Sequence, residues 1–140
     1  MKNVLLSLVC LFIFFGCQSN AVKNVDGTYG FDADAWKAAM TALDPNFSKA
    51  PAELVTKMTD TFNQFNMVIK DKAITANFGQ TVMPGTLAEV SKTDKGTVYK
   101  MTPTDEKQKT QTIIVTINGD QMTAGPEGND KQVMYFKKTK

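Results

Sequence analysis

The chain of 140 residues contains no histidine and no arginine, and its two cysteines, Cys10 and Cys17, both lie near the amino terminus. Histidine and free cysteine carry most general-base, nucleophilic and transition-metal chemistry near neutral pH. Zinc, haem and thiol-based mechanisms are therefore excluded. Without arginine, and with a formal net charge of only +2, the chain also lacks the basic patch of a nucleic-acid-binding protein. We expect no metal, no cofactor and no nucleic-acid partner.

The first seventeen residues have the layout of a secretory signal. Lys2 supplies a positive charge, residues 4–15 form an apolar run, and Gly16 is the small residue that a signal peptidase requires. The run is shorter than the roughly 20 apolar residues that a transmembrane helix needs. Plain secretion is an alternative, but Phe14 is bulky at a position where that cleavage favours a small side chain. The segment predicts export from the cytoplasm.

The segment Phe14-Phe15-Gly16-Cys17 resembles the lipobox of bacterial lipoproteins, which ends in an invariant cysteine. The resemblance implies cleavage between Gly16 and Cys17, a diacylglyceryl group on the Cys17 sulfur and acylation of the freed amine. The two phenylalanines depart from the leucine and small residue that are commonest at their places. Gln18 is not aspartate, which implies the outer membrane if the envelope has one, with the domain on its periplasmic or cell-surface face.

This resemblance also sets the expected domain organisation. Residues 1–16 form the signal peptide, residues 17–25 the lipidated cysteine and a short tether, and residues 26–140 a single globular domain. Cys10 is discarded with the signal and Cys17 is consumed by the lipid. The mature domain therefore has neither a disulfide nor a free thiol, and its core alone must stabilise it.

Two helices are predicted near the start of the domain. Asp32 or Asp34 caps the first, and Pro45 ends it. Its apolar positions are Trp36, Ala39, Met40 and Leu43. The second helix begins near Pro51, and its apolar stripe consists of Leu54, Val55, Met58, Phe62 and Phe65. Each helix should therefore pack by one side against another part of the domain.

The remainder of the chain predicts antiparallel sheet. After a short strand at residues 25–31 and the two helices, apolar residues alternate with polar ones from Met67 onward. Turns are predicted at Asp71-Lys72, at residues 93–96 and at Asn118-Gly119. We predict an α+β fold in which two short helices pack on an antiparallel, meander-type curved sheet of about six to seven strands.

The first predicted strand contains Gly27-Thr28-Tyr29, which resembles the Gly-x-Trp of the first strand in calycins and lipocalins. The group lacks two consecutive helices after that strand. The resemblance implies a pocket for a small apolar ligand. Between helices and sheet, the side chains that we expect to line such a pocket are Trp36, Met40, Phe62, Phe65, Phe78 and Tyr99. The alternative is that these side chains simply form the core.

The acidic residues offer no clear catalytic pair. Most of them lie where helix caps and reverse turns place acids, and no histidine is present to act as a base. Oxygen ligands for calcium gather in two loops, but without EF-hand spacing, at Asn118, Asp120, Glu127, Asn129 and Asp130. The lysines at 137, 138 and 140 are interpreted as a solubilising strand end. We expect a protein without catalytic activity.

Two functions remain. The first is an envelope interaction or structural protein that the Cys17 lipid holds at the membrane and that contacts a protein partner. The second is a lipocalin-like binding module for a small apolar ligand. We favour the first, because it requires no pocket.

Overall fold

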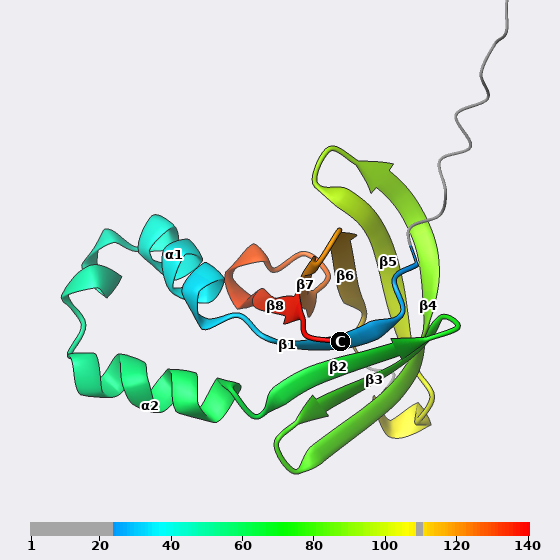
Figure 1. The fold of residues 1–140 in the computed structure, drawn as a ribbon, viewed down its shortest axis with the longest axis horizontal. Helices are drawn as coiled ribbons and strands as arrows, with labels where there is room; N and C mark the ends of the chain where they lie inside the picture. Colours follow the sequence, from blue (N-terminus) through cyan, green and yellow to red (C-terminus); the bar gives the residue numbers. More distant parts are fainter. Residues whose placement is uncertain (1–23, 109–110) are drawn as a thin grey trace, which may run out of the picture.

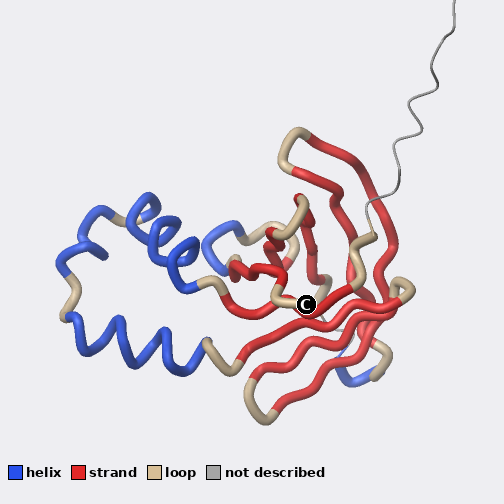
Figure 2. Tube along the Cα trace, viewed as in Figure 1, coloured by secondary structure: helices blue, strands red, loops and turns tan. Residues whose placement is uncertain are grey.

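The structure, a computed structural model, describes residues 24–108 and 111–140 as a closed antiparallel barrel with a pair of helices at one end (Figure 1, Figure 2). The predicted signal peptide, the cleavage point at Gly16 and the lipidated Cys17 lie outside the described residues. The strands are β1 (Gly27–Phe31), β2 (Phe65–Lys70), β3 (Ala73–Phe78), β4 (Thr81–Thr93), β5 (Gly96–Pro103), β6 (Ile113–Asn118), β7 (Gln121–Pro126) and β8 (Met134–Lys138). The helices are α1 (Ala33–Leu43) and α2 (Ala52–Phe62), with short 3-10 helices at Pro45–Lys49, Glu106–Gln108 and Asp130–Gln132.

The α+β class and the antiparallel meander are confirmed, but the prediction of six to seven strands in an open curved sheet is slightly wrong. Eight strands pair in chain order, and β8 pairs back with β1 through Phe31↔Phe136 and Gly30↔Lys137. Closure satisfies the backbone groups that two sheet edges would otherwise expose. The sheet is therefore a barrel without a free edge.

Strand β4 extends through a stretch where the alternating pattern of the sequence is interrupted. Pro84 and Gly85 interrupt the pattern there, yet they pair with Thr75 and Ile74 of β3. The Pro84 carbonyl accepts a hydrogen bond from the Thr104 N–H beyond the end of β5, so the missing N–H of the proline points away from β3. At Gly85 a Cβ atom would lie 2.7 Å from a backbone oxygen of β5, so only glycine fits.

The predicted hairpins are present. Asp71 and Lys72 form the β2–β3 turn with φ of 52° and 66°, the left-handed values that a tight two-residue hairpin turn requires. The β6–β7 turn consists of Gly119-Asp120, one residue further along than predicted, and Gly119 has a φ of 61°. These turns set the register that directs alternate side chains into the barrel.

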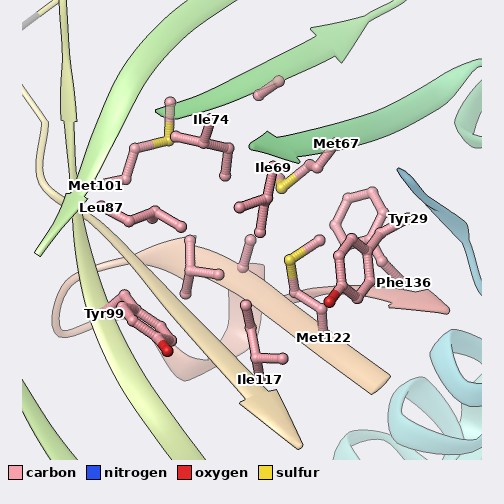
Figure 3. Close-up of a cluster of buried hydrophobic side chains, with 13 residues drawn as sticks. Tyr29, Met67, Ile69, Ile74, Leu87, Tyr99, Met101, Ile117, Met122 and Phe136 are labelled. Atoms are coloured by element: carbon pink, nitrogen blue, oxygen red, sulfur yellow. The ribbon is translucent and has the colours of Figure 1, made fainter. Parts of the chain in front are cut away.

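Inward-facing side chains from all eight strands fill the barrel (Figure 3). The thirteen core residues are Tyr29, Met67, Ile69, Ile74, Ala76, Leu87, Tyr99, Met101, Val115, Ile117, Met122, Ala124 and Phe136. Eight of the largest are less than 2% exposed. Within residues 24–108 and 111–140, these side chains and the eight strand pairings form a closed barrel with a filled interior.

The two ends of the barrel differ. Residue 24, the β2–β3, β4–β5 and β6–β7 turns and the end of β8 lie at one end, which we call the mouth. The helices connect β1 to β2 at the other end (Figure 1). We call residues 32–63 the helical arm. The chain therefore enters the barrel at the mouth and leaves β1 for the arm at the opposite end.

The helical arm begins at a capped helix. The Asp32 carboxylate accepts a hydrogen bond of 3.0 Å from the Ala35 N–H, as predicted. Trp36 on α1 is buried, but Leu43 near the end of α1 and Leu54 near the start of α2 are 53% and 52% exposed. The predicted apolar stripes therefore pack only along the part of the arm nearest the barrel.

Candidate ligand-binding site

Four of the six predicted pocket residues meet where the helical arm joins the barrel. Ring centroids of Trp36 and Phe62 lie 5.3 Å apart, those of Phe62 and Phe65 5.4 Å, and those of Phe65 and Phe78 5.2 Å. Edge-to-face and tilted contacts at these distances stabilise aromatic pairs. The four rings therefore pack against one another where a ligand between helices and sheet was expected.

The other two predicted residues lie elsewhere. Met40 is half-buried on α1. Tyr99 is an inward-facing residue of β5, where it pairs with Glu89 and Val115. It lies near the mouth of the barrel rather than at the arm. The structure thus divides the predicted set between the two ends of the molecule.

The mouth contains a cavity of about 700 Å³, which we call the cup. Its lining combines the floor residues Tyr99 and Ile117 with the β4–β5 and β6–β7 turns and the first described residues. It consists of Asn24, Val25, Glu89, Lys92, Thr93, Gly96, Thr97, Tyr99, Ile117, Asn118, Gly119, Asp120 and Lys138. Ligands often bind in the mouths of barrels, and volumes of roughly 300–1,000 Å³ are typical. The cup is our candidate site.

Four charged residues line the cup, Glu89, Lys92, Asp120 and Lys138, and the sequence had indicated only Asp120 among them, as a possible calcium ligand. Lys138 can be identified from the alternation of side chains along β8. It lies two residues after Phe136, which points into the barrel, so the Lys138 side chain also points inward. Asp120 bears the same relation to Met122. The alternation of inward-facing residues, continued to the charged residues at the strand ends, therefore indicates the site, which the aromatic residues alone do not.

Two buried tyrosines lie next to or within the lining of the cup: Tyr99 lines it, and Tyr29 contacts the lining residue Val25. The Tyr29 hydroxyl donates a hydrogen bond of 2.9 Å to the Val25 carbonyl. Burial, followed by the negative charge of Asp120, raises the pKa of Tyr29. Burial, followed by the charge of Glu89, raises the pKa of Tyr99. Both hydroxyls therefore release their protons only at a higher pH than a free tyrosine does.

These raised pKa values predict a loss of stability in alkali. Above the ordinary tyrosine pKa of 10.0, the unfolded chain releases protons that Tyr29 and Tyr99 retain in the folded state. The unfolded state then binds fewer protons, so the free energy of unfolding falls as pH rises. Urea unfolding across this pH range should show a smaller fall for Tyr99→Phe than for the unsubstituted protein. Parallel pH profiles would contradict the assignment.

A second cavity of about 720 Å³ lies outside the barrel. Ala39 and Leu43 of α1 line one side, and outward-facing residues of β5 to β8, among them Val98 and Tyr135, line the other. This groove extends the exposed apolar surface of the helical arm along the barrel wall.

The oxygen-rich loops that we considered for calcium do not converge. Asn118 and Asp120 lie at the mouth, while Glu127, Asn129 and Asp130 follow β7 at its other end. In the described part of the chain, no group of three or more histidine, cysteine or acidic side chains is placed to hold a metal ion. None of the helices within residues 24–108 and 111–140 is long and apolar enough to span a membrane.

The geometry defines the class of protein as a small closed antiparallel barrel with an inserted helical pair, which is compatible with a lipocalin-like fold. Comparison with protein-family models, with curated proteins and with solved structures finds no match.

Proposed function

We propose that this chain is a lipid-anchored envelope protein without catalytic activity, whose barrel presents the helical arm to a protein partner. One observation carries the proposal: the chain enters the barrel at the mouth, and the arm leaves from the opposite end (Figure 1). An anchor at Cys17 holds the mouth next to the membrane. The arm then points away from the membrane, into the compartment where a partner is found.

The length of the tether supports this orientation. Six residues separate Cys17 from Asn24, the first described residue, which lines the cup. Even fully extended, they span at most about 25 Å. The mouth of the barrel therefore stays within one domain diameter of the lipid. Gln18 after the anchor favours the outer membrane where one exists.

The surface of the arm supports contact with a protein. Leu43 and Leu54 are more than half exposed, and a groove bordered by Leu43 continues the apolar surface onto the barrel wall. The arm carries five acidic residues against three lysines, a net charge of −2. Apolar positions within an acidic surface fit a partner that offers an apolar pocket with a basic rim.

Site-specific photo-crosslinking in intact cells tests this function. We expect a photoreactive residue at position 43 or 54 to yield the same discrete crosslinked protein from both positions. Val82 on the barrel wall is 55% exposed and provides a control of equal accessibility. Equal crosslinking at all three positions, or none at the two leucine positions, would contradict a partner on the arm.

Binding of a small molecule is the second candidate function, and the cup is the observation that favours it. The aromatic rings that were expected to line a ligand pocket pack against one another instead. A lipocalin-like function would therefore use the mouth of the barrel rather than a space beneath the helices.

A further inference from the structure

A β-bulge places two opposite charges on one wall of the cup. The β4–β5 pairing is regular up to Glu89↔Tyr99 and resumes at Ser91↔Val98, so Val90 is the extra residue. Without the bulge, Glu89 and Lys92 would point to opposite faces of the strand. With it, both are on the inward face, and both line the cup.

The resulting ion pair is loose. Lys92 Nζ lies 3.8 Å from Glu89 Oε1, and both side chains are exposed. Such a pair contributes little to stability, since water screens it and holding two long side chains in place costs entropy. Both charges therefore remain available to a ligand.

The opposite wall carries a second pair of charges. Lys138 follows the inward-facing Phe136 by two residues, and its ammonium group lies 5.9 Å from the centre of the Tyr29 ring. Gly27 leaves the room for this side chain, because a Cβ atom at residue 27 would lie 2.5 Å from Lys138 Cε. The Lys138 N–H donates a hydrogen bond of 2.7 Å to the Asp120 carbonyl, which keeps the two residues together.

These walls face each other across the barrel. β4 and β8 are four strands apart in a ring of eight, so Glu89 and Lys92 lie opposite Lys138. The floor between them is formed by Tyr99 and Ile117, which are 7% and 5% exposed. The cup thus combines one positive and one negative side chain on each wall with a mainly apolar floor.

We propose that the cup binds a small zwitterion, whose ammonium group contacts a carboxylate on one wall and whose phosphate or carboxylate contacts the lysine on the other. The proposal rests on the small-molecule function of the cup. A ligand with a single charge pairs with the opposite charges of the cup but leaves the like charges without a counterion, which opposes its binding. A zwitterion places each of its charges against an opposite one, and short charge-assisted hydrogen bonds fix its orientation.

Two sources supply this chemistry. One is a free zwitterion in the surrounding solution. The other is a phosphoethanolamine headgroup of the membrane, because Asn24 lines the cup and the proposed anchor lies seven residues before it. Both present an ammonium group and an anionic group a few bonds apart. A binding experiment with one arm for the soluble compound and one for the membrane lipid distinguishes the two sources.

The experiment uses the chain from residue 18 onward, which keeps every strand and core residue of the barrel. Calorimetry measures its binding to glycerophosphoethanolamine, to glycerol 3-phosphate, to ethanolamine and to the uncharged 1-octanol. Vesicles of phosphatidylethanolamine with phosphatidylglycerol form the second arm, with phosphatidylglycerol vesicles as reference. The test variant is Glu89→Gln with Lys92→Met, which keeps the net charge. The matched control is Glu127→Gln with Lys100→Met, which removes a comparably exposed ion pair of 3.9 Å outside the cup.

We expect glycerophosphoethanolamine, or the vesicles that contain its lipid, to bind at least about tenfold more tightly than either singly charged fragment or the reference vesicles. The test variant should lose this preference, and the control should keep it. Gly27→Ala should also weaken binding, because its Cβ atom would meet both Lys138 Cε and the Lys140 carbonyl oxygen at 2.5 Å. Binding of free glycerophosphoethanolamine but not of the vesicles identifies a soluble ligand, and binding of the vesicles but not of the free compound identifies a lipid headgroup. Equal binding of glycerol 3-phosphate, or no loss in the test variant, overturns the proposal. Binding of 1-octanol alone overturns it but leaves a small-molecule function of the cup, whereas no binding of any probe contradicts both.

Discussion

Substitution of Cys17 by serine should abolish fatty-acid labelling of the protein and release it from membranes into the soluble fraction. Serine has no thiolate to accept the diacylglyceryl group, so the variant carries no acyl chain to hold it at the membrane. Cys10→Ser is the matched control, since Cys10 lies within the apolar run and would be removed with it. We expect normal labelling and sedimentation of that variant. Metabolic labelling with an alkyne fatty acid, followed by membrane fractionation, measures both properties.

The expected change is nearly complete because of how lipid anchors bind. Each buried CH₂ of an acyl chain contributes about 0.8 kcal/mol, and one chain alone gives only reversible binding. The lipobox resemblance implies two chains from the glyceride and a third on the amine, which together hold a protein at the membrane for long periods. Labelling that persists in Cys17→Ser, or is lost in Cys10→Ser, would contradict an anchor at Cys17.

Local elements of this fold were predictable because they depend on neighbours in the chain. The Asp32 cap and Pro45 bound the first helix, and Asp71-Lys72 turns one hairpin. In each case a few adjacent residues determine the backbone path. The period of two from Met67 onward likewise identified which side chains face inward, as the buried Met67 and Ile69 confirm.

Closure of the barrel was not predictable in this way. The alternation of apolar and polar residues along a strand indicates which face of the strand is buried, but it does not indicate which strand pairs with it. Pairing of β1 with β8 joins residues more than one hundred positions apart, and its hydrogen bonds form only when all eight strands curve together. The same holds for the helices. An apolar stripe shows which side of a helix is buried but not how far along the helix the barrel lies beneath it, and Leu43 and Leu54 remain exposed.

The candidate site was missed for a related reason. The charges of the cup come from β4, the β6–β7 turn and β8, and closure alone brings them to one opening. The bulge at Val90, which turns Lys92 inward, has no clear signature in the sequence. Of the six aromatic and apolar residues proposed for a pocket, only Tyr99 lines this opening.

Phe136→Ala should destabilise the protein by about 3–5 kcal/mol, the usual cost of removing a buried aromatic ring. Phe136 is 1% exposed, and it pairs with Phe31 of β1 across the closure of the barrel. Its ring also meets the Phe31 ring edge-on at 6.5 Å, and Phe31 in turn contacts Trp36 and Phe62 of the helical arm. One side chain therefore links the core, the closing strand pair and the arm.

Comparison with a second aromatic residue separates these contributions. Phe47 contacts Trp36 edge-on at 5.5 Å, but it is only half-buried and lies on the arm, away from the barrel. We expect Phe47→Ala to cost about 1–2 kcal/mol, since it loses one aromatic pair and part of its burial. Urea unfolding followed by circular dichroism measures both variants, and the fluorescence of the single tryptophan, Trp36, reports on the arm. If closure by β8 holds barrel and arm as one cooperative unit, Phe136→Ala shifts both signals together. Separate transitions, or a smaller loss for Phe136→Ala than for Phe47→Ala, would show that the arm is stabilised independently of the closing strand.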